Sequence, residues 1–128
     1  MSEHRVTKPE EMFRFVELKP FTTAWADLGL GEEDLTALQI AIMMGPQDHP
    51  VVQGTGGLRK MRFAPRKWKK GKSGAARVGY VYLENHGTVL LVIAYAKDEQ
   101  DDLTAEERKI IRSLIQRIEH EFSSGIIR

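Results

Sequence analysis

The sequence predicts one domain of mixed α/β (α+β) class, with elements in the order β-α-α-β-β-β-α. Its 128 residues leave room for a single domain. Hydrophobic residues make up 41% and charged residues 29%, which is typical of a chain that buries a core. Segments with strand and helix periodicity then follow one another in the order given. We expect the folded domain at 12–123, preceded by a flexible leader at 1–11 and followed by a tail at 124–128.

The first half of the chain predicts a strand and a helical hairpin. Residues 12–18 (MFRFVEL) mix aromatic and β-branched residues with nearly alternating polarity, as strands do. Pro20 ends this strand and suits the first turn of a helix, which we expect over 21–28. A second helix begins at 32–34, where three acidic residues favour the helix dipole, and ends at the Gly-Pro pair at 45–46.

The second half predicts a three-stranded meander and a final helix. The strand segments are 58–64, 76–83 and 88–96. Asn and Gly in the turn 84–87 favour a tight hairpin between the last two strands. The continuous apolar run of the last strand indicates a central, buried position. Thr104 and Glu107 form a capping box, which begins an amphipathic helix that extends to Phe122.

Composition excludes several classes of protein. No apolar run approaches the ~18 residues that a membrane span requires, and the polar N-terminus lacks the core of a secretion signal. The absence of cysteine excludes disulfides and thiolate metal sites. The histidines have no ligand spacing, so we expect no metal and no cofactor; they are His4, His49, His86 and His120. The simplest interpretation is a cytoplasmic, metal-free protein.

Charge is strongly segregated, although the net charge is only +1. Nine basic residues and no acidic one lie between positions 59 and 77: Arg59, Lys60, Arg62, Arg66, Lys67, Lys69, Lys70, Lys72 and Arg77. The balance reverses over 98–107, which contains six acidic residues. This basic block predicts a surface that faces a polyanion. The alternative is a solvated basic loop with no partner.

The meander is expected to gather cations from distant positions, namely Lys60, Arg62, Arg77 and Lys97. If the three strands are antiparallel neighbours, the end of the first meets the start of the second, which places Arg62 near Arg77. Lys97 follows the third strand at the end adjacent to Arg77. The strands would then have an apolar face and a charged face.

Such a cluster suits cleavage of an RNA phosphodiester. The ribose 2′-hydroxyl must lose its proton, the charge on phosphorus must be stabilised, and the leaving 5′-oxygen must gain a proton. Fixed cations stabilise the developing charge, and a desolvated lysine among cations can transfer protons. Tyr80 and Tyr95 could stack on a base or position a proton. The alternative is that these residues only bind phosphates.

Three segments resemble the HigB/RelE-like toxins of bacterial type II toxin–antitoxin systems: GTGGLRKMRFA, GKSGAARVGYVY and YAKDEQDDLTAEE. The resemblance covers roughly 12–120, with the elements in the same order. It implies the RelE-like fold, with a mainly antiparallel sheet and helices packed on one face. It also implies ribosome-dependent endonuclease cleavage of mRNA in the A site, and neutralisation by a cognate HigA-like antitoxin.

The resemblance further assigns roles to individual residues. The implied catalytic residues are Lys60, Arg62, Arg77 and Lys97. The resemblance implies that the basic loop faces ribosomal RNA, through Arg66, Lys67, Lys69, Lys70 and Lys72. From the basic block and the cluster of cations and tyrosines, we also expect Arg59, Tyr80 and Tyr95 to bind RNA or the ribosome. The C-terminal catalytic tyrosine of the RelE branch has no counterpart here, because Leu103 and Thr104 stand in its place. The general base stays open between Lys97 and Lys60, with Tyr95 less favoured. The alternative functions are a ParE-like toxin that poisons gyrase and a non-catalytic RNA-binding module.

Overall fold

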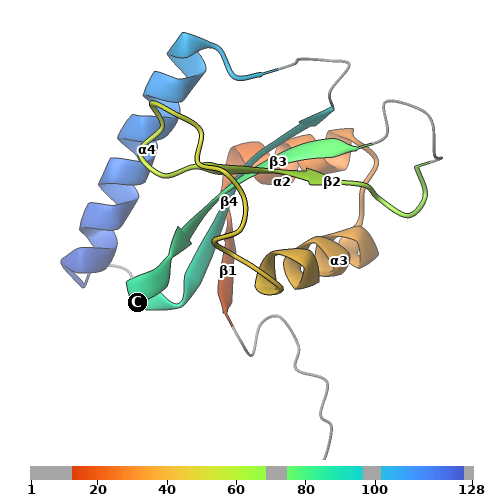
Figure 1. Ribbon diagram of the computed structural model, residues 1–128, viewed down its shortest axis with the longest axis horizontal. Coiled ribbons are helices and arrows are strands. Elements are labelled where there is room, and N and C mark those ends of the chain that lie inside the picture. The colour runs from red at the N-terminus through yellow and green to blue at the C-terminus, as the bar shows by residue number, and fades with distance from the viewer. Residues whose placement is uncertain (1–12, 69–74, 97–101, 126–128) are drawn as a thin grey trace, which may run out of the picture.

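The computed structural model describes residues 13–68, 75–96 and 102–125. In these residues, a four-stranded sheet is flanked by three α-helices (Figure 1). The strands are β1 (Arg14–Glu17), β2 (Arg59–Phe63), β3 (Ala76–Leu83) and β4 (Thr88–Ala96). The helices are α2 (Lys19–Asp27), α3 (Glu32–Met43), α4 (Ala105–Ser123) and the short 3-10 helix η1 (Glu84–His86). The order of elements and the mixed class are as predicted.

The sheet has the strand order β1-β4-β3-β2. The antiparallel meander β2-β3-β4 is confirmed, and β1 joins it by pairing in parallel with β4. The predicted central position of β4 is also confirmed, since it lies between β1 and β3. Gly87 closes the β3–β4 hairpin with a φ of +56°, a conformation that favours glycine.

The helices divide between the two faces of the sheet, so the expectation that they share one face is wrong. Phe21 of α2 and Leu38 of α3 pack with Leu91 of β4 in one hydrophobic cluster. Ile115 of α4 packs with Leu90, the neighbouring residue of β4, in a second cluster. Adjacent residues of a strand point to opposite faces. Both faces of β4 are therefore covered by helices, which explains why its residues are apolar at almost every position.

The helix ends follow the predicted signals. The Asp34 carboxylate accepts a hydrogen bond from the Gly31 N–H at 3.0 Å, which caps α3. The capping box of α4 is present, with the Thr104 hydroxyl accepting from the Glu107 N–H at 3.1 Å. The predicted leader and residues 126–128 of the tail lie outside the described residues, so the domain limits stay predictions.

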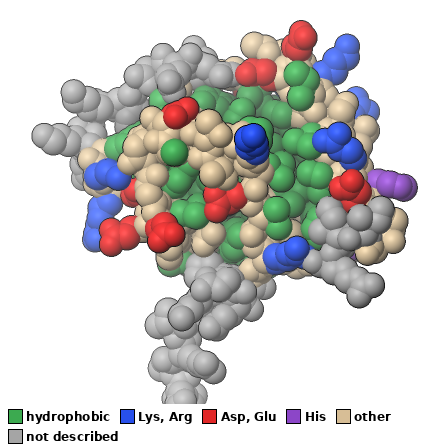
Figure 2. All heavy atoms as spheres, turned by 180° about the vertical axis from the view of Figure 1, so that it is seen from behind, with side chains coloured by type: hydrophobic (Ala, Val, Ile, Leu, Met, Phe, Trp, Pro, Cys, Tyr) green, Lys and Arg blue, Asp and Glu red, His purple; other side chains and the backbone are tan. Residues whose placement is uncertain are grey.

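No helix in the described part of the chain is long and apolar enough to cross a membrane. Seen from behind, hydrophobic side chains gather over the centre of the molecule (Figure 2). A small apolar groove of about 160 Å³ lies between α2, β4 and α4, and its lining includes Pro20, Ile93, Ile110 and Leu114. Ile110 keeps 63% of its surface exposed.

Candidate functional site

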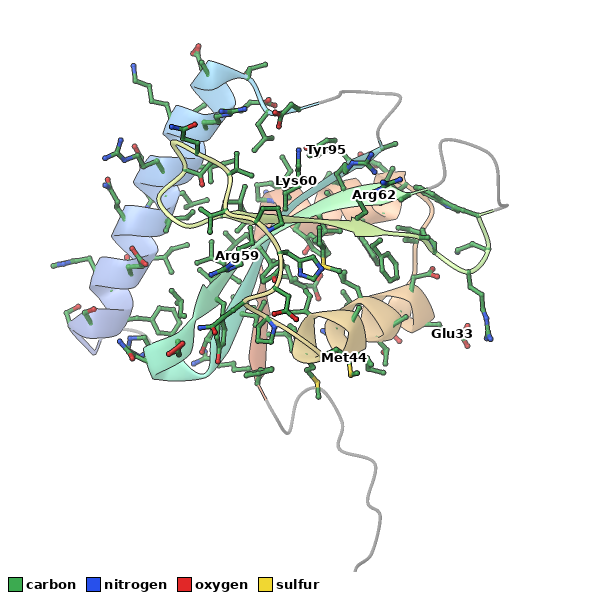
Figure 3. All side chains as sticks on the ribbon, viewed as in Figure 1. Glu33, Met44, Arg59, Lys60, Arg62 and Tyr95 are labelled. Carbon is green, nitrogen blue, oxygen red and sulfur yellow. The ribbon has the colours of Figure 1, made fainter. Side chains whose placement is uncertain are left out.

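Three predicted site residues lie in one row across the sheet. Arg62 of β2 is the partner of Arg77 on β3, and Arg77 is the partner of Tyr95 on β4. Directly opposed residues of antiparallel strands project from the same face. Lys60 precedes Arg62 by two positions and shares that face. Figure 3 shows Lys60, Arg62 and Tyr95 at the same end of the sheet. The predicted approach of Arg62 to Arg77 is confirmed, whereas Lys97 lies outside the described residues.

A β-bulge in β4 brings Tyr95 into this row. Gly79 pairs with Ile93 and Tyr80 pairs with Leu91, so Val92 is an additional residue on β4. Strict alternation from Leu91 would place Tyr95 on the α2–α3 face. The additional residue reverses the alternation, and Tyr95 packs in the α4 cluster instead.

Gly79 lies at the bulge, where a side chain would be crowded. A Cβ atom there would lie 3.0 Å from the Ile93 Cγ2 atom and 3.1 Å from the Leu58 methyl carbons. Contacts this short would force the packing on the α4 face to shift. A glycine therefore leaves room for the Ile93 and Leu58 side chains to pack over β3 beside the cationic row.

Arg77 is a buried cation. Only 7% of its surface is exposed, and its Nη1 atom donates to the Ala75 carbonyl at 3.3 Å. None of the ion pairs between described residues involves Arg77. A buried guanidinium is costly unless an anion or a hydrogen-bond acceptor lies beside it. Its exposed neighbour Arg62 adds a second positive charge, so this end of the sheet favours an anionic ligand.

Tyr95 places an unpartnered hydroxyl beside these cations. The residue is 7% exposed, and its buried hydroxyl has no hydrogen-bond partner among the described residues. Burial raises the pKa of Tyr95, and the Asp102 carboxylate raises it further, while Arg77 opposes both effects. The phenol therefore stays protonated at neutral pH, and because its oxygen is buried, a ligand reaches it only after the side chains that cover it move.

Asp102 links Lys60 to α4. Its carboxylate lies 3.5 Å from the Lys60 Nζ atom and 3.0 Å from the Arg108 Nη2 atom. The hydrogen bond from the Leu103 N–H lowers the pKa of Asp102, and Lys60 and Arg108 lower it further. Sequence reasoning missed Arg108 because its link to Lys60 runs through Asp102, which lies 42 positions after Lys60 in the chain. No sequence signal marked this arginine.

Tyr80 and Arg59 lie elsewhere and have structural contacts. Tyr80 is fully buried on the α2–α3 face, where its hydroxyl donates to the Pro46 carbonyl at 2.7 Å and lies 3.2 Å from His49 Nδ1. Burial raises the pKa of Tyr80 to about 12. Arg59 donates to the Gln47 and His49 carbonyls at 3.0 and 2.7 Å. Tyr80 has no exposed surface on which a base could stack, so we exclude it from the site. Arg59 instead supports the loop that contains Gln47 and His49.

The described part of the basic loop is attached to the helical hairpin. The Lys67 Nζ atom lies 3.2 Å from the Asp34 carboxylate and donates to the Gly29 carbonyl at 2.8 Å. Arg66 is exposed. The remaining predicted cations of this loop, Lys69, Lys70 and Lys72, lie outside the described residues.

Within residues 13–68, 75–96 and 102–125, no three His, Asp or Glu side chains come together as a metal site would require. The described site therefore consists of cations, a phenol and one bridging carboxylate. Of these groups, the guanidinium and ammonium ions suit phosphate oxygens.

The sequence matches no protein-family model. Among solved structures, the chain is similar to the toxin RelE of E. coli, in the form of an arginine double mutant in the free state. The TM-score is 0.49 at 12% sequence identity, and the match covers 70% of this chain and 88% of that chain. The likeness to RelE is one of fold alone.

Proposed function

We propose that this protein is an endoribonuclease toxin of the HigB/RelE type, which cleaves mRNA in the ribosomal A site. The observation that supports this most is the row Arg62–Arg77–Tyr95, in which a buried guanidinium and a buried hydroxyl lie beside an exposed arginine. A phosphodiester has acceptor oxygens for all three groups. The resemblance of the three sequence segments supports the same class of protein.

The proposed reaction is an internal displacement at phosphorus. A new bond forms between the ribose 2′-oxygen and phosphorus, and the bond between phosphorus and the 5′-oxygen breaks. The 2′-hydroxyl gives its proton to a base, and the leaving 5′-oxygen takes up a proton. Negative charge grows on the non-bridging oxygens, so donors already fixed in place lower the barrier.

Each side chain has a role in this reaction. Arg62 and Arg77 bind the non-bridging oxygens, and Tyr95 donates a hydrogen bond because its hydroxyl stays protonated. Lys60 already contacts the Asp102 carboxylate at 3.5 Å, which favours a role in charge stabilisation. Lys97 is then the preferred base.

The partners follow from the resemblance and from charge. The exposed Arg66 and Lys67, with Lys69, Lys70 and Lys72, form a basic segment suited to ribosomal RNA. A HigA-like antitoxin neutralises the toxin, and both act in the cytoplasm, where ribosomes lie. Replacing Lys67, Lys69 and Lys70 with glutamine should weaken co-sedimentation with ribosomes and flatten its salt dependence. An unaltered salt slope would contradict this role of the loop.

A second candidate is a non-catalytic RNA-binding module. The pairing of Lys60 with Asp102 favours it, because a lysine held by a carboxylate is suited to binding and not to proton transfer. Both functions predict RNA binding, and only the first predicts strand breaks.

Controlled expression in bacteria distinguishes the candidates. The full chain should stop growth and produce breaks in translated mRNA, which primer extension maps to codon positions. The neighbouring HigA-like gene, where present, should restore growth. DNA breaks that depend on gyrase would indicate a ParE-like toxin instead. RNA binding without breaks in mRNA would indicate the non-catalytic RNA-binding module.

A further inference from the structure

A second basic surface lies next to the site, on α4 and outside the segment 59–77. It is a groove of about 650 Å³ between the loop after Val52 and the first turns of α4. Its principal lining residues are Gln53, Gly54, Glu106, Arg108, Lys109 and Arg112. The volume is in the range of sites that hold small ligands.

The charge of this groove favours an anion. Three cations and one carboxylate line it. Lys109 and Arg112 are exposed, and no ion pair between described residues involves either of them. Neighbouring cations that a carboxylate does not neutralise repel one another, and a chain of phosphates would relieve that repulsion.

Both walls of the groove are held in place. The Arg108 Nη1 atom donates to the Gln53 carbonyl at 3.4 Å, which ties α4 to the loop. The buried Thr55 hydroxyl donates to the Val52 carbonyl at 2.6 Å and accepts from the Leu58 N–H at 3.0 Å. Gly54 has a φ of +84°, which a side chain would strain. The groove is therefore formed before any ligand arrives.

Arg108 makes the groove continuous with the cationic site. Its Nη2 atom lies 3.0 Å from Asp102, whose other carboxylate oxygen lies 3.5 Å from Lys60. Lys60 in turn shares the face of Arg62. A path of positive charge thus runs from the sheet, across one carboxylate, to the second turn of α4.

We infer that this groove binds the phosphate backbone of single-stranded RNA, on the strand whose scissile phosphate lies at Arg62 and Arg77. This inference rests on the proposed function and extends it, because it gives the path of the RNA beyond the cleaved bond. An acidic protein segment is the other polyanion that could lie here, and the experiment below tests for it.

The test compares a Lys109→Gln, Arg112→Gln double variant with Arg117→Gln. Arg117 is exposed on the same helix and does not line the groove. The probe is a 2′-O-methyl RNA of about twelve nucleotides, a length within the site sizes of single-strand binding proteins. The methyl group blocks attack by the 2′-oxygen, so fluorescence anisotropy reports binding alone. Thermal unfolding confirms that each full-length variant is folded.

The double variant should bind this RNA roughly tenfold more weakly near 100 mM salt, with a log–log salt slope smaller by about 1.4, since each phosphate contact on a single strand contributes ~0.7. Arg117→Gln should bind as the wild type does. Equal affinity and slope in the double variant would overturn the groove assignment and leave the proposed function intact. If the double variant binds RNA as the wild type does but no longer binds a poly-glutamate peptide, the groove assignment is also overturned, and the groove binds an acidic protein segment instead. If the wild type binds no RNA in this assay, the groove assignment fails, and the proposed function is decided separately by cleavage of ribosome-bound mRNA.

Discussion

Tyr80 and Tyr95 lie on neighbouring strands, and both are almost completely buried, on opposite faces of the sheet. On the α2–α3 face, the Tyr80 hydroxyl bonds to Pro46 and lies within hydrogen-bond distance of His49. On the α4 face, the Tyr95 hydroxyl is also buried, and no described residue partners it. Burial raises the pKa of both tyrosines. Both faces therefore bury a phenolic hydroxyl, which has hydrogen-bond partners on the α2–α3 face and none among the described residues on the α4 face.

This difference separates a structural tyrosine from a functional one. A buried polar group without a partner costs about 1–3 kcal/mol, so the Tyr95 hydroxyl lowers the stability of the free protein. Arg77 lies opposite it, and its charge is also buried, with no ion pair among the described residues. A bound phosphodiester would supply acceptors to both groups. We interpret this end of the α4 face as a place where stability is lower so that an anion can bind.

The largest expected effect is on catalysis, from Arg77→Met. Methionine places an unbranched apolar side chain in the buried position and removes the charge, so the fold should persist. Cleavage of ribosome-bound mRNA should fall by about 10²- to 10³-fold, the range typical for the loss of one donor to the transition state. Quantitative primer extension measures the rate, and circular dichroism checks the fold. A folded variant with the wild-type rate would remove Arg77 from the site.

The comparison of the tyrosines is sharpest in paired Phe substitutions. Tyr80→Phe leaves the Pro46 carbonyl without its donor and should lower the free energy of unfolding by about 1–3 kcal/mol. Tyr95→Phe removes a hydroxyl that has no described partner and should leave stability unchanged or raise it, while weakening RNA cleavage. Urea unfolding measures the stability of each variant, and the cleavage assay measures its activity. A Tyr95→Phe variant that is destabilised but fully active would reverse our assignment.

Alkaline pH should destabilise the fold through Tyr80. Its pKa rises from an ordinary 10.0 to about 12 in the folded state. A raised pKa contributes stability that is complete below pH 10 and is lost as the pH rises toward 12. The loss is at most about 2.7 kcal/mol for two pKa units. Tyr80→Phe should reduce this slope, and the raised pKa of Tyr95 should leave a remaining slope of the same sign. A slope unaffected by Tyr80→Phe would show that other groups cause it.

The smallest expected effect is from Asp102→Asn. The Asp102 carboxylate contacts Lys60 and Arg108 and competes with a phosphate for them. Neutralising it should raise RNA affinity about threefold at low salt, and less as salt screens the charges. Stability should change little, because Asp102 is 49% exposed. Weaker RNA binding by this variant would mean that Asp102 positions Lys60 for its role and does not compete with the ligand.

Much of the fold could be predicted because its signals are local. The bounds of β3 and β4 match the predicted 76–83 and 88–96, since an apolar run, a turn and a second apolar run define a hairpin without reference to distant residues. The side of the sheet that each helix covers could not be predicted, because both faces of β4 are apolar and either can receive a helix.

The site was predictable in part. The register of two antiparallel strands placed Arg62 beside Arg77, as expected. Alternation along β3 places Tyr80 on the face opposite to Arg77, three positions earlier, so the sequence carried the signal that excludes Tyr80. The face of Tyr95 could not be predicted, because the bulge at Val92 reverses the alternation of β4 and the sequence does not reveal an additional residue. Arg108 enters only through tertiary contacts with Asp102 and Gln53.

The most direct test of the central claim is the chemistry of the RNA ends. Purified protein is incubated with ribosomes that carry a defined mRNA, and the fragments are analysed for their termini. Attack by the 2′-oxygen at a phosphate held by Arg62 and Arg77 predicts a 2′,3′-cyclic phosphate on one fragment and a 5′-hydroxyl on the other. Fragments with 5′-phosphate ends, or intact mRNA in the presence of folded protein, would contradict the account.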